Sequence, residues 1–90
     1  MKLSTTERYS KKEAKFFAKH QELLERYEKV LAQLTEDYTA TWLKTHKLKG
    51  KLSEYHAVSL TYEYRIVIFI KIIDDEIILV NIGTHDEVYD

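Results

Sequence analysis

The sequence predicts an α+β fold in which two N-terminal helices pack on a small antiparallel β-sheet. Apolar residues recur at spacings of three and four up to Leu34, and from Tyr55 onward they are β-branched and separated by short polar breaks. The chain has 90 residues, of which 44% are hydrophobic and 32% charged. This composition predicts one domain, residues 1–90, with a modest core.

The first half of the chain predicts a short strand followed by two helices. Residues 1–7 are expected to form the strand, and Ser10-Lys11-Lys12-Glu13 fits the capping box that begins a helix. The apolar face of this first helix comprises Ala14, Phe17 and Ala18. The second helix has a longer apolar face, made by Leu23, Leu24, Tyr27, Val30, Leu31 and Leu34. A further helical turn within residues 35–44 is expected to bury Trp42 as a core anchor.

The second half of the chain predicts three antiparallel strands. Residues 56–60, 64–73 and 77–82 are rich in β-branched side chains. Polar segments at residues 61–63 and 74–76 separate these strands and are expected to be the hairpin loops. The sheet therefore follows the helices in the chain, which is typical of an α+β domain.

Strict alternation of side chains gives a register for the last two strands. It directs two sets of residues toward the helices, namely Ile66, Ile68, Ile70 and Ile72, and Ile78, Val80 and Ile82. Matching these sets pairs Ile70 with Val80 and Ile68 with Ile82.

The same register brings polar side chains together on the face that the helices leave open. It places Arg65 opposite His85, and across the preceding loop it pairs Val58 with Ile66 and Ser59 with Arg65. A guanidinium beside an imidazole suits phosphate chemistry, because arginine binds phosphate oxygens and histidine exchanges protons near neutral pH. On residue types alone, an exposed arginine and a surface histidine without a catalytic role is the simpler interpretation.

Composition excludes several classes of protein. The chain has no cysteine, and its four histidines are scattered, so neither a disulfide framework nor a metal site is expected. No apolar run approaches the roughly 20 residues of a membrane span, which predicts a cytoplasmic protein without a membrane partner. Residues 1–51 carry 12 Lys/Arg and 7 Asp/Glu, a balance of +5, whereas residues 52–90 carry 2 and 8, a balance of −6. A basic surface is therefore possible on a nearly neutral molecule.

Three motifs in the second half of the chain resemble the RelE superfamily of toxin–antitoxin ribonucleases, and its YafQ-like branch most closely. They are His46-Lys47-Leu48-Lys49-Gly50-Lys51-Leu52, Tyr64-Arg65-Ile66-Val67-Ile68 and Ile82-Gly83-Thr84-His85-Asp86-Glu87-Val88-Tyr89. The resemblance implies a RelE/ParE-like fold and the toxin of a type II toxin–antitoxin system. It also implies ribosome-dependent cleavage of mRNA in the A site without a metal or other cofactor, by attack of the ribose 2′-OH on the adjacent phosphate. The implied partners are an antitoxin, in a possible hetero-oligomer, the ribosome and mRNA.

The resemblance also implies roles for four residues. His85 matches the C-terminal catalytic histidine of the family and would act as the general acid. Arg65 matches the arginine that stabilises charge on the phosphate in several members. His46 matches the histidine before the Lys-Gly motif and would be a base or a substrate contact. Tyr89 matches the terminal aromatic residue, which would stack on a base or orient His85.

Two positions depart from the YafQ-like pattern. Ser59 stands where a second histidine is usual, and Glu63 stands where the pattern has aspartate. The general base is therefore His46 or, second, Glu63. Ser59 and the basic run formed by Lys47, Lys49 and Lys51 are expected to contact RNA, since lysines bind phosphate without reading sequence.

Two other functions fit the same fold. A ParE-like toxin would act on DNA gyrase and would not require the ending with His85 and Tyr89. A catalytically silent module that only binds an antitoxin is favoured by Ser59 and by the pI of about 6.4, which is low for these toxins.

Overall fold

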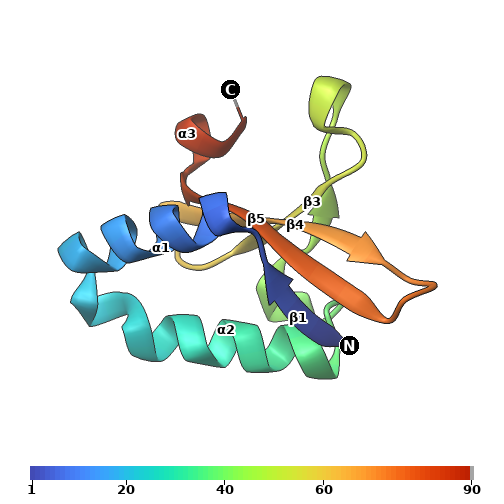
Figure 1. Ribbon diagram of the computed structural model, residues 1–90, viewed down its shortest axis with the longest axis horizontal. Coiled ribbons are helices and arrows are strands. Elements are labelled where there is room, and N and C mark those ends of the chain that lie inside the picture. Colours follow the sequence, from blue (N-terminus) through green and yellow to red (C-terminus); the bar gives the residue numbers. More distant parts are fainter. Residues whose placement is uncertain (90) are drawn as a thin grey trace.

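The computed structural model describes residues 1–89 and has the predicted α+β architecture. The elements in chain order are β1 (Lys2–Thr5), α1 (Glu7–Lys19), η1 (Gln21–Leu23), α2 (Leu24–Glu36), η2 (Thr41–Leu43), β2 (His46–Lys47), η3 (Gly50–Leu52), β3 (His56–Ser59), β4 (Tyr64–Lys71), β5 (Glu76–Thr84) and α3 (His85–Tyr89). Figure 1 shows α1 and α2 on one side of the sheet, whereas α3 and the segment between β2 and β3 project from the other side. No helix within residues 1–89 is both long enough and apolar enough to cross a bilayer.

The sheet has five strands in the order β1-β5-β4-β3-β2. The strands from β2 to β5 pair antiparallel, as predicted, but β1 pairs parallel with β5, from Lys2↔Glu76 to Thr5↔Leu79. The sheet is therefore mixed rather than wholly antiparallel. Parallel neighbours need a long crossover connection, and here the chain from α1 to β4 supplies it.

The predicted capping box at Ser10 is wrong, because α1 begins three residues before Ser10, at Glu7. Thr6 is the N-cap, and its hydroxyl accepts a hydrogen bond from the Tyr9 N–H at 3.0 Å. This earlier start places Tyr9 in the core, where its hydroxyl lies 2.7 Å from that of Tyr27. Tyr27 in turn donates to the Glu13 carboxylate, so the predicted cap residue Glu13 serves this network instead. Burial raises the pKa of both tyrosines.

The main core lies between α1, α2 and the sheet. It comprises Tyr9, Phe17, Tyr27, Val30, Leu34, Leu43, Val58, Leu60, Ile66, Ile68, Ile77, Leu79 and Ile82. Ala14 and Ala18 are exposed, so the predicted apolar face of α1 is only partly right. Trp42 is 39% exposed and is not a core anchor, because the next residue, Leu43, takes that place. The Trp42 ring instead lies 5.1 Å below the Arg26 guanidinium, and its N–H donates to Gln33.

The predicted register of β4 with β5 is wrong. Ile70 pairs with Ile77 and Ile68 with Leu79, because the turn between the strands lies earlier than predicted. The register then shifts between Val67 and Ile68, and Arg65 pairs with Gly83. At this bulge Val80 has no partner on β4, so Leu79 faces the helices and Val80 the other side, opposite to the prediction. The Ile82 N–H at the bulge donates to the Asn81 side chain at 3.0 Å. The β4–β5 turn also lies earlier than expected, at residues 72–75.

The face away from α1 and α2 carries a second, smaller cluster. Its buried members are Leu48, Ala57, Val67 and Val88, with Leu52, Tyr55, Val80 and Tyr89 packed against them. This face was expected to be open, but α3 packs on it through Val88, and its last residue, Tyr89, reaches the segment that follows β2. The cluster therefore fixes the place where the C-terminal helix meets His46.

Candidate functional site

The five-residue helix α3 is held by a reciprocal capping box. The Glu87 N–H donates to the Thr84 hydroxyl at 3.2 Å, and the Thr84 N–H donates to the Glu87 carboxylate at 2.8 Å. The hydrogen bonds from Thr84 lower the pKa of Glu87. A Cβ at Gly83 would lie only 3.1 Å from Glu87 Oε1, so the glycine gives this carboxylate room to reach the backbone. A single helical turn is unstable alone, and the cap and the burial of Val88 together hold it.

His85 and Tyr89 lie one turn apart on α3 and therefore share a face. Their ring centroids are 4.2 Å apart and their planes are nearly perpendicular, at 80°. The His85 side chain is 63% exposed, and its Nδ1 lies 3.5 Å from the Asp86 carboxylate. The imidazole is thus oriented by an aromatic ring and still accessible to a ligand.

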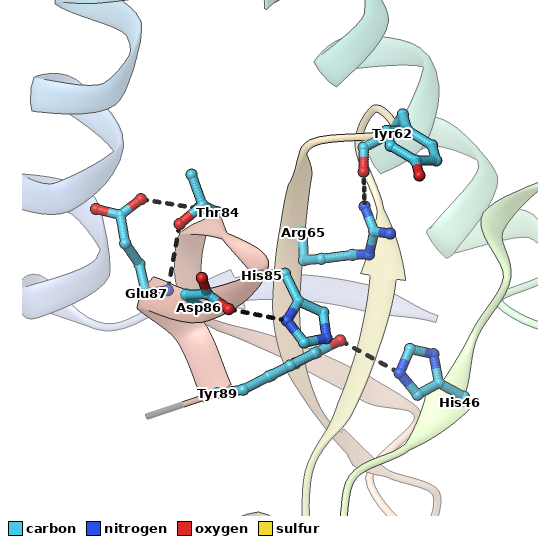
Figure 2. Close-up of polar contacts among 8 residues, drawn as sticks. All are labelled: His46, Tyr62, Arg65, Thr84, His85, Asp86, Glu87 and Tyr89. Atoms are coloured by element: carbon cyan, nitrogen blue, oxygen red, sulfur yellow. Dashed lines mark hydrogen bonds and ion pairs between the residues drawn. The ribbon is translucent and has the colours of Figure 1, made fainter.

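His46 joins the same cluster from β2. Its Nε2 lies 3.2 Å from the Tyr89 hydroxyl, and its Nδ1 lies 3.0 Å from the Lys44 carbonyl oxygen. Because a carbonyl only accepts hydrogen bonds, Nδ1 carries the proton, and in the neutral ring Nε2 accepts from Tyr89. Figure 2 shows the Tyr89 side chain passing beside His85 and ending at His46.

Arg65 is anchored at the start of β4. Its Nη1 donates to the carbonyl oxygens of Thr61, Tyr62 and Tyr64 at 2.7, 2.9 and 3.1 Å. In Figure 2 the guanidinium points toward the Tyr62 backbone, and the side chains of His85 and Tyr89 lie in the same view of the site. Burial raises the pKa of Tyr89, and the nearby positive charge of Arg65 opposes part of this rise.

The structure brings most of the predicted catalytic residues together. Arg65, His85, Tyr89 and His46 form one cluster on the side of the sheet away from α1 and α2. Arg65 pairs with Gly83 rather than with His85, and His85 joins the cluster from α3, where the chain has left the strand. Ser59 pairs with Arg65 as predicted. Glu63 is exposed in the preceding loop, and within residues 1–89 its carboxylate forms no hydrogen bond or ion pair.

Only part of the predicted basic run, formed by Lys47, Lys49 and Lys51, lies at this site. A groove of about 290 Å³ is lined by His46, Lys47, Leu48, Lys49, Leu52 and Tyr89. Lys51 is exposed in η3 and does not line the groove. Two of the three lysines therefore flank the rings of His46 and Tyr89. Within residues 1–89, no three His, Asp or Glu side chains are placed to hold a metal ion.

Sequence reasoning missed the two residues that hold α3. Thr84 and Glu87 have the spacing of a capping box in the printed sequence. The pattern predicts a helix start at Thr84, and it would have placed His85 and Tyr89 on one helical face rather than on a continuing strand.

Comparison with solved structures places this fold among bacterial toxins. The YafQ structure from E. coli strain BL21(DE3) superimposes with a TM-score of 0.80 and 13% identity, over 98% of this chain and 97% of that one. A metal-bound toxin from Helicobacter pylori gives a TM-score of 0.79 and 28% identity, over 98% of both chains. The E. coli DinJ–YafQ toxin–antitoxin complex gives a TM-score of 0.78 and 17% identity, over 98% of this chain and 96% of that one.

No protein-family model matches the chain, and neither does any curated protein sequence. The solved structures share the fold almost end to end, so the predicted resemblance to YafQ-like toxins is confirmed for the fold. Among these neighbours, YafQ is a toxin that is also solved in complex with its antitoxin DinJ.

Proposed function

We propose that this protein is the toxin of a type II toxin–antitoxin system and acts as a ribosome-dependent endoribonuclease that cleaves mRNA in the A site. The observation that carries the proposal is the single cluster of Arg65, His85, Tyr89 and His46 on the side of the sheet away from α1 and α2. Two imidazoles and a guanidinium are sufficient for phosphodiester transfer by acid–base catalysis. The likeness to toxins over nearly the whole chain supports the same conclusion.

The reaction joins the ribose 2′-oxygen to the adjacent phosphorus and breaks the bond from phosphorus to the 5′-oxygen. A base takes the proton of the 2′-OH, and an acid gives a proton to the departing 5′-oxygen. The products are a 2′,3′-cyclic phosphate and a free 5′-hydroxyl. His85 is the acid, because its ring is exposed and is held beside Arg65 and Tyr89.

Arg65 stabilises the charge that grows on the phosphate. Its Nη1 is occupied by three backbone carbonyls, which leaves the hydrogens of Nη2 and Nε for a phosphate oxygen. A donor that is already fixed needs no reorganisation during the reaction, and such preorganised charge is usually the largest catalytic contribution.

His46 is the better candidate for the base. Its Nε2 carries the lone pair and already accepts a hydrogen bond from Tyr89, so a 2′-OH can take the place of that hydroxyl. Glu63 remains the second candidate, because its exposed carboxylate has no partner within residues 1–89. Comparing His46→Ala with Glu63→Ala in the cleavage assay distinguishes the two bases, since only loss of the true base abolishes cutting.

An antitoxin, the ribosome and mRNA are the proposed partners, and the cytoplasm is the proposed location. The antitoxin follows from the structural neighbour that is bound to DinJ. Lys47 and Lys49 line the groove beside His46 and would hold RNA phosphates there, with Lys51 and Ser59 as further contacts.

The test is single-turnover cleavage of mRNA on programmed ribosomes. His85→Ala should lower the rate by about 10²–10⁴-fold, the usual contribution of a positioned acid. His56→Gln is the matched control, because His56 pairs with Ile68, whose side chain belongs to the helix-side core, and therefore lies on the other face. Equal rates for wild type and His85→Ala would refute the assignment. Growth arrest without cleavage by the wild type would favour the gyrase alternative, and an inert wild type would favour the silent module.

A further inference from the structure

A larger cavity lies on the other side of α3 from the His46 groove. It has a volume of about 660 Å³ and separates α1 from the junction between β5 and α3. Its lining includes Lys12, Lys15, Phe16 and Lys19 of α1, His20 just after α1, and Tyr64 of β4. The sequence predicts RNA contact for Ser59, Lys47, Lys49 and Lys51 and for none of these residues.

The cavity carries an excess of positive charge. Lys12, Lys15 and Lys19 follow at spacings of three and four and therefore share one side of α1. None of the three forms an ion pair within residues 1–89, unlike Lys11 and Lys29, which pair with glutamates on their own helices. Glu87 is the acidic residue in the described lining, and its carboxylate is already bonded to the Thr84 N–H.

Aromatic rings form the wall behind the lysines. Phe16 and His20 lie 4.5 Å apart between centroids, and each lies 5.0 Å from the ring of Tyr64. All three side chains are half-buried, so they are held in place and still reach the cavity. Fixed rings beside unpaired ammonium groups are the combination that binds single-stranded nucleic acid, through base stacking and phosphate contacts.

The cavity adjoins the candidate active site along the chain. Thr84 lines the cavity and caps α3, and the next residue is His85. Tyr64 likewise precedes Arg65, and adjacent residues of a strand point to opposite faces. The end of the sheet therefore presents the aromatic cavity on one face and the catalytic cluster on the other. The two are one residue apart in the chain at Tyr64–Arg65 in β4 and at Thr84–His85, where β5 meets α3.

We propose that this cavity binds the single-stranded stretch of substrate RNA that adjoins the cleaved bond. The RNA strand passes over Thr84, and its phosphates contact Lys12, Lys15 and Lys19. One base stacks against the rings of Tyr64, Phe16 and His20. The lysines span seven residues of helix, or about 10 Å, which is long enough to meet more than one phosphate. The inference rests on the proposed function, because it assigns a second part of the same substrate.

The experiment measures binding of a short fluorescein-labelled single-stranded RNA by anisotropy at several salt concentrations, in the His85→Ala background so that the RNA is not cut. Replacing Lys12, Lys15 and Lys19 with alanine should lower the slope of log K against log salt by about 2 and weaken binding by about 10²-fold at 0.1 M salt. The matched control replaces Lys11, Lys29 and Lys71, three ion-paired lysines, and removes the same charge. The control should keep most of the affinity.

A second variant tests the aromatic wall. Tyr64→Leu should weaken binding by at least about fivefold, whereas Tyr64→Phe, which keeps the ring, should bind as the parent does. Equal affinities for the two lysine triples would overturn the proposal, as would loss of antitoxin binding without loss of RNA binding. Cleavage on ribosomes by the wild type separates this proposal from the proposed function. If the wild type cuts normally and the variant without Lys12, Lys15 and Lys19 binds RNA as tightly as the parent, the cavity is rejected and the proposed function stands.

Discussion

The two faces of the sheet are held in place very differently. Within residues 1–89, thirteen buried hydrophobic side chains lie between the sheet and the helices α1 and α2, whereas four hold α3 on the opposite face. The cluster of Arg65, His85, Tyr89 and His46 is on the face with the smaller hydrophobic cluster. Side chains that exchange protons with a substrate must be accessible to that substrate and to water, and burying their charged forms is costly, so they do not belong in a large dry core. The stability of the fold and the order of the site therefore depend on different residues.

The largest expected effect is on the helix-side core. Ile68 is fully buried there, and Ile68→Ala should lower the free energy of unfolding by about 2–5 kcal/mol, because it removes apolar contact and leaves a cavity. Val67, the next residue on β4, faces the smaller cluster, and Val67→Ala should cost less, about 1–2 kcal/mol. Urea denaturation measures both. Equal losses would mean that the two faces contribute equally to stability.

The two hairpins show how far the sequence could predict this fold. Between β3 and β4 the alternation is unbroken, and the predicted pair Ser59↔Arg65 is correct. Between β4 and β5 the earlier turn displaces the predicted pairs, and a bulge adds Val80 to one strand and changes its alternation. A bulge changes the parity of a strand without changing its composition, so alternation alone does not reveal it.

The candidate site was predicted by residue type but not by geometry. His85 and Arg65 lie in one cluster, although His85 joins it from α3 rather than by strand pairing. Trp42 shows the opposite error, since a large apolar residue was assigned to the core while its smaller neighbour Leu43 is the buried one. Periodicity over a single helical turn does not distinguish adjacent residues, and only tertiary packing decides between them.

The next prediction concerns the cap that holds α3. Glu87→Ala removes the acceptor for the Thr84 N–H, and losing such a cap shifts the helix equilibrium by about 5–30-fold. Single-turnover cleavage should fall by a similar factor, while the urea midpoint should hardly change, because Glu87 contributes nothing to the main core. Amide exchange within α3 should become faster. A large loss of global stability with unchanged exchange would contradict this role.

Glu87→Gln distinguishes the cap from a charge effect, because glutamine also accepts the hydrogen bond and should restore cleavage. The sign of the pH dependence follows from the lowered pKa of Glu87. The ionised Glu87 carboxylate stabilises α3 at any pH above the pKa that Glu87 has in the unfolded chain. This stabilisation is lost as the pH falls through the lower pKa that Glu87 has in the folded protein. Amide shifts of α3 in the wild type should therefore move on acidification from about pH 6 to about pH 3, and the glutamine variant should lack this transition.

The smallest expected effect is that of the Tyr89 hydroxyl. Tyr89→Phe keeps the ring against His85, at 4.2 Å between centroids, but removes the 3.2 Å hydrogen bond to His46. A net hydrogen bond is worth about 0.5–1.5 kcal/mol, so the cleavage rate should fall by only about 2–12-fold. Tyr89→Ala also removes the ring that orients His85, so it should lower the cleavage rate further. If Tyr89→Phe lost as much rate as His85→Ala, the phenol itself would be the proton donor, and His85 would be the residue that positions it.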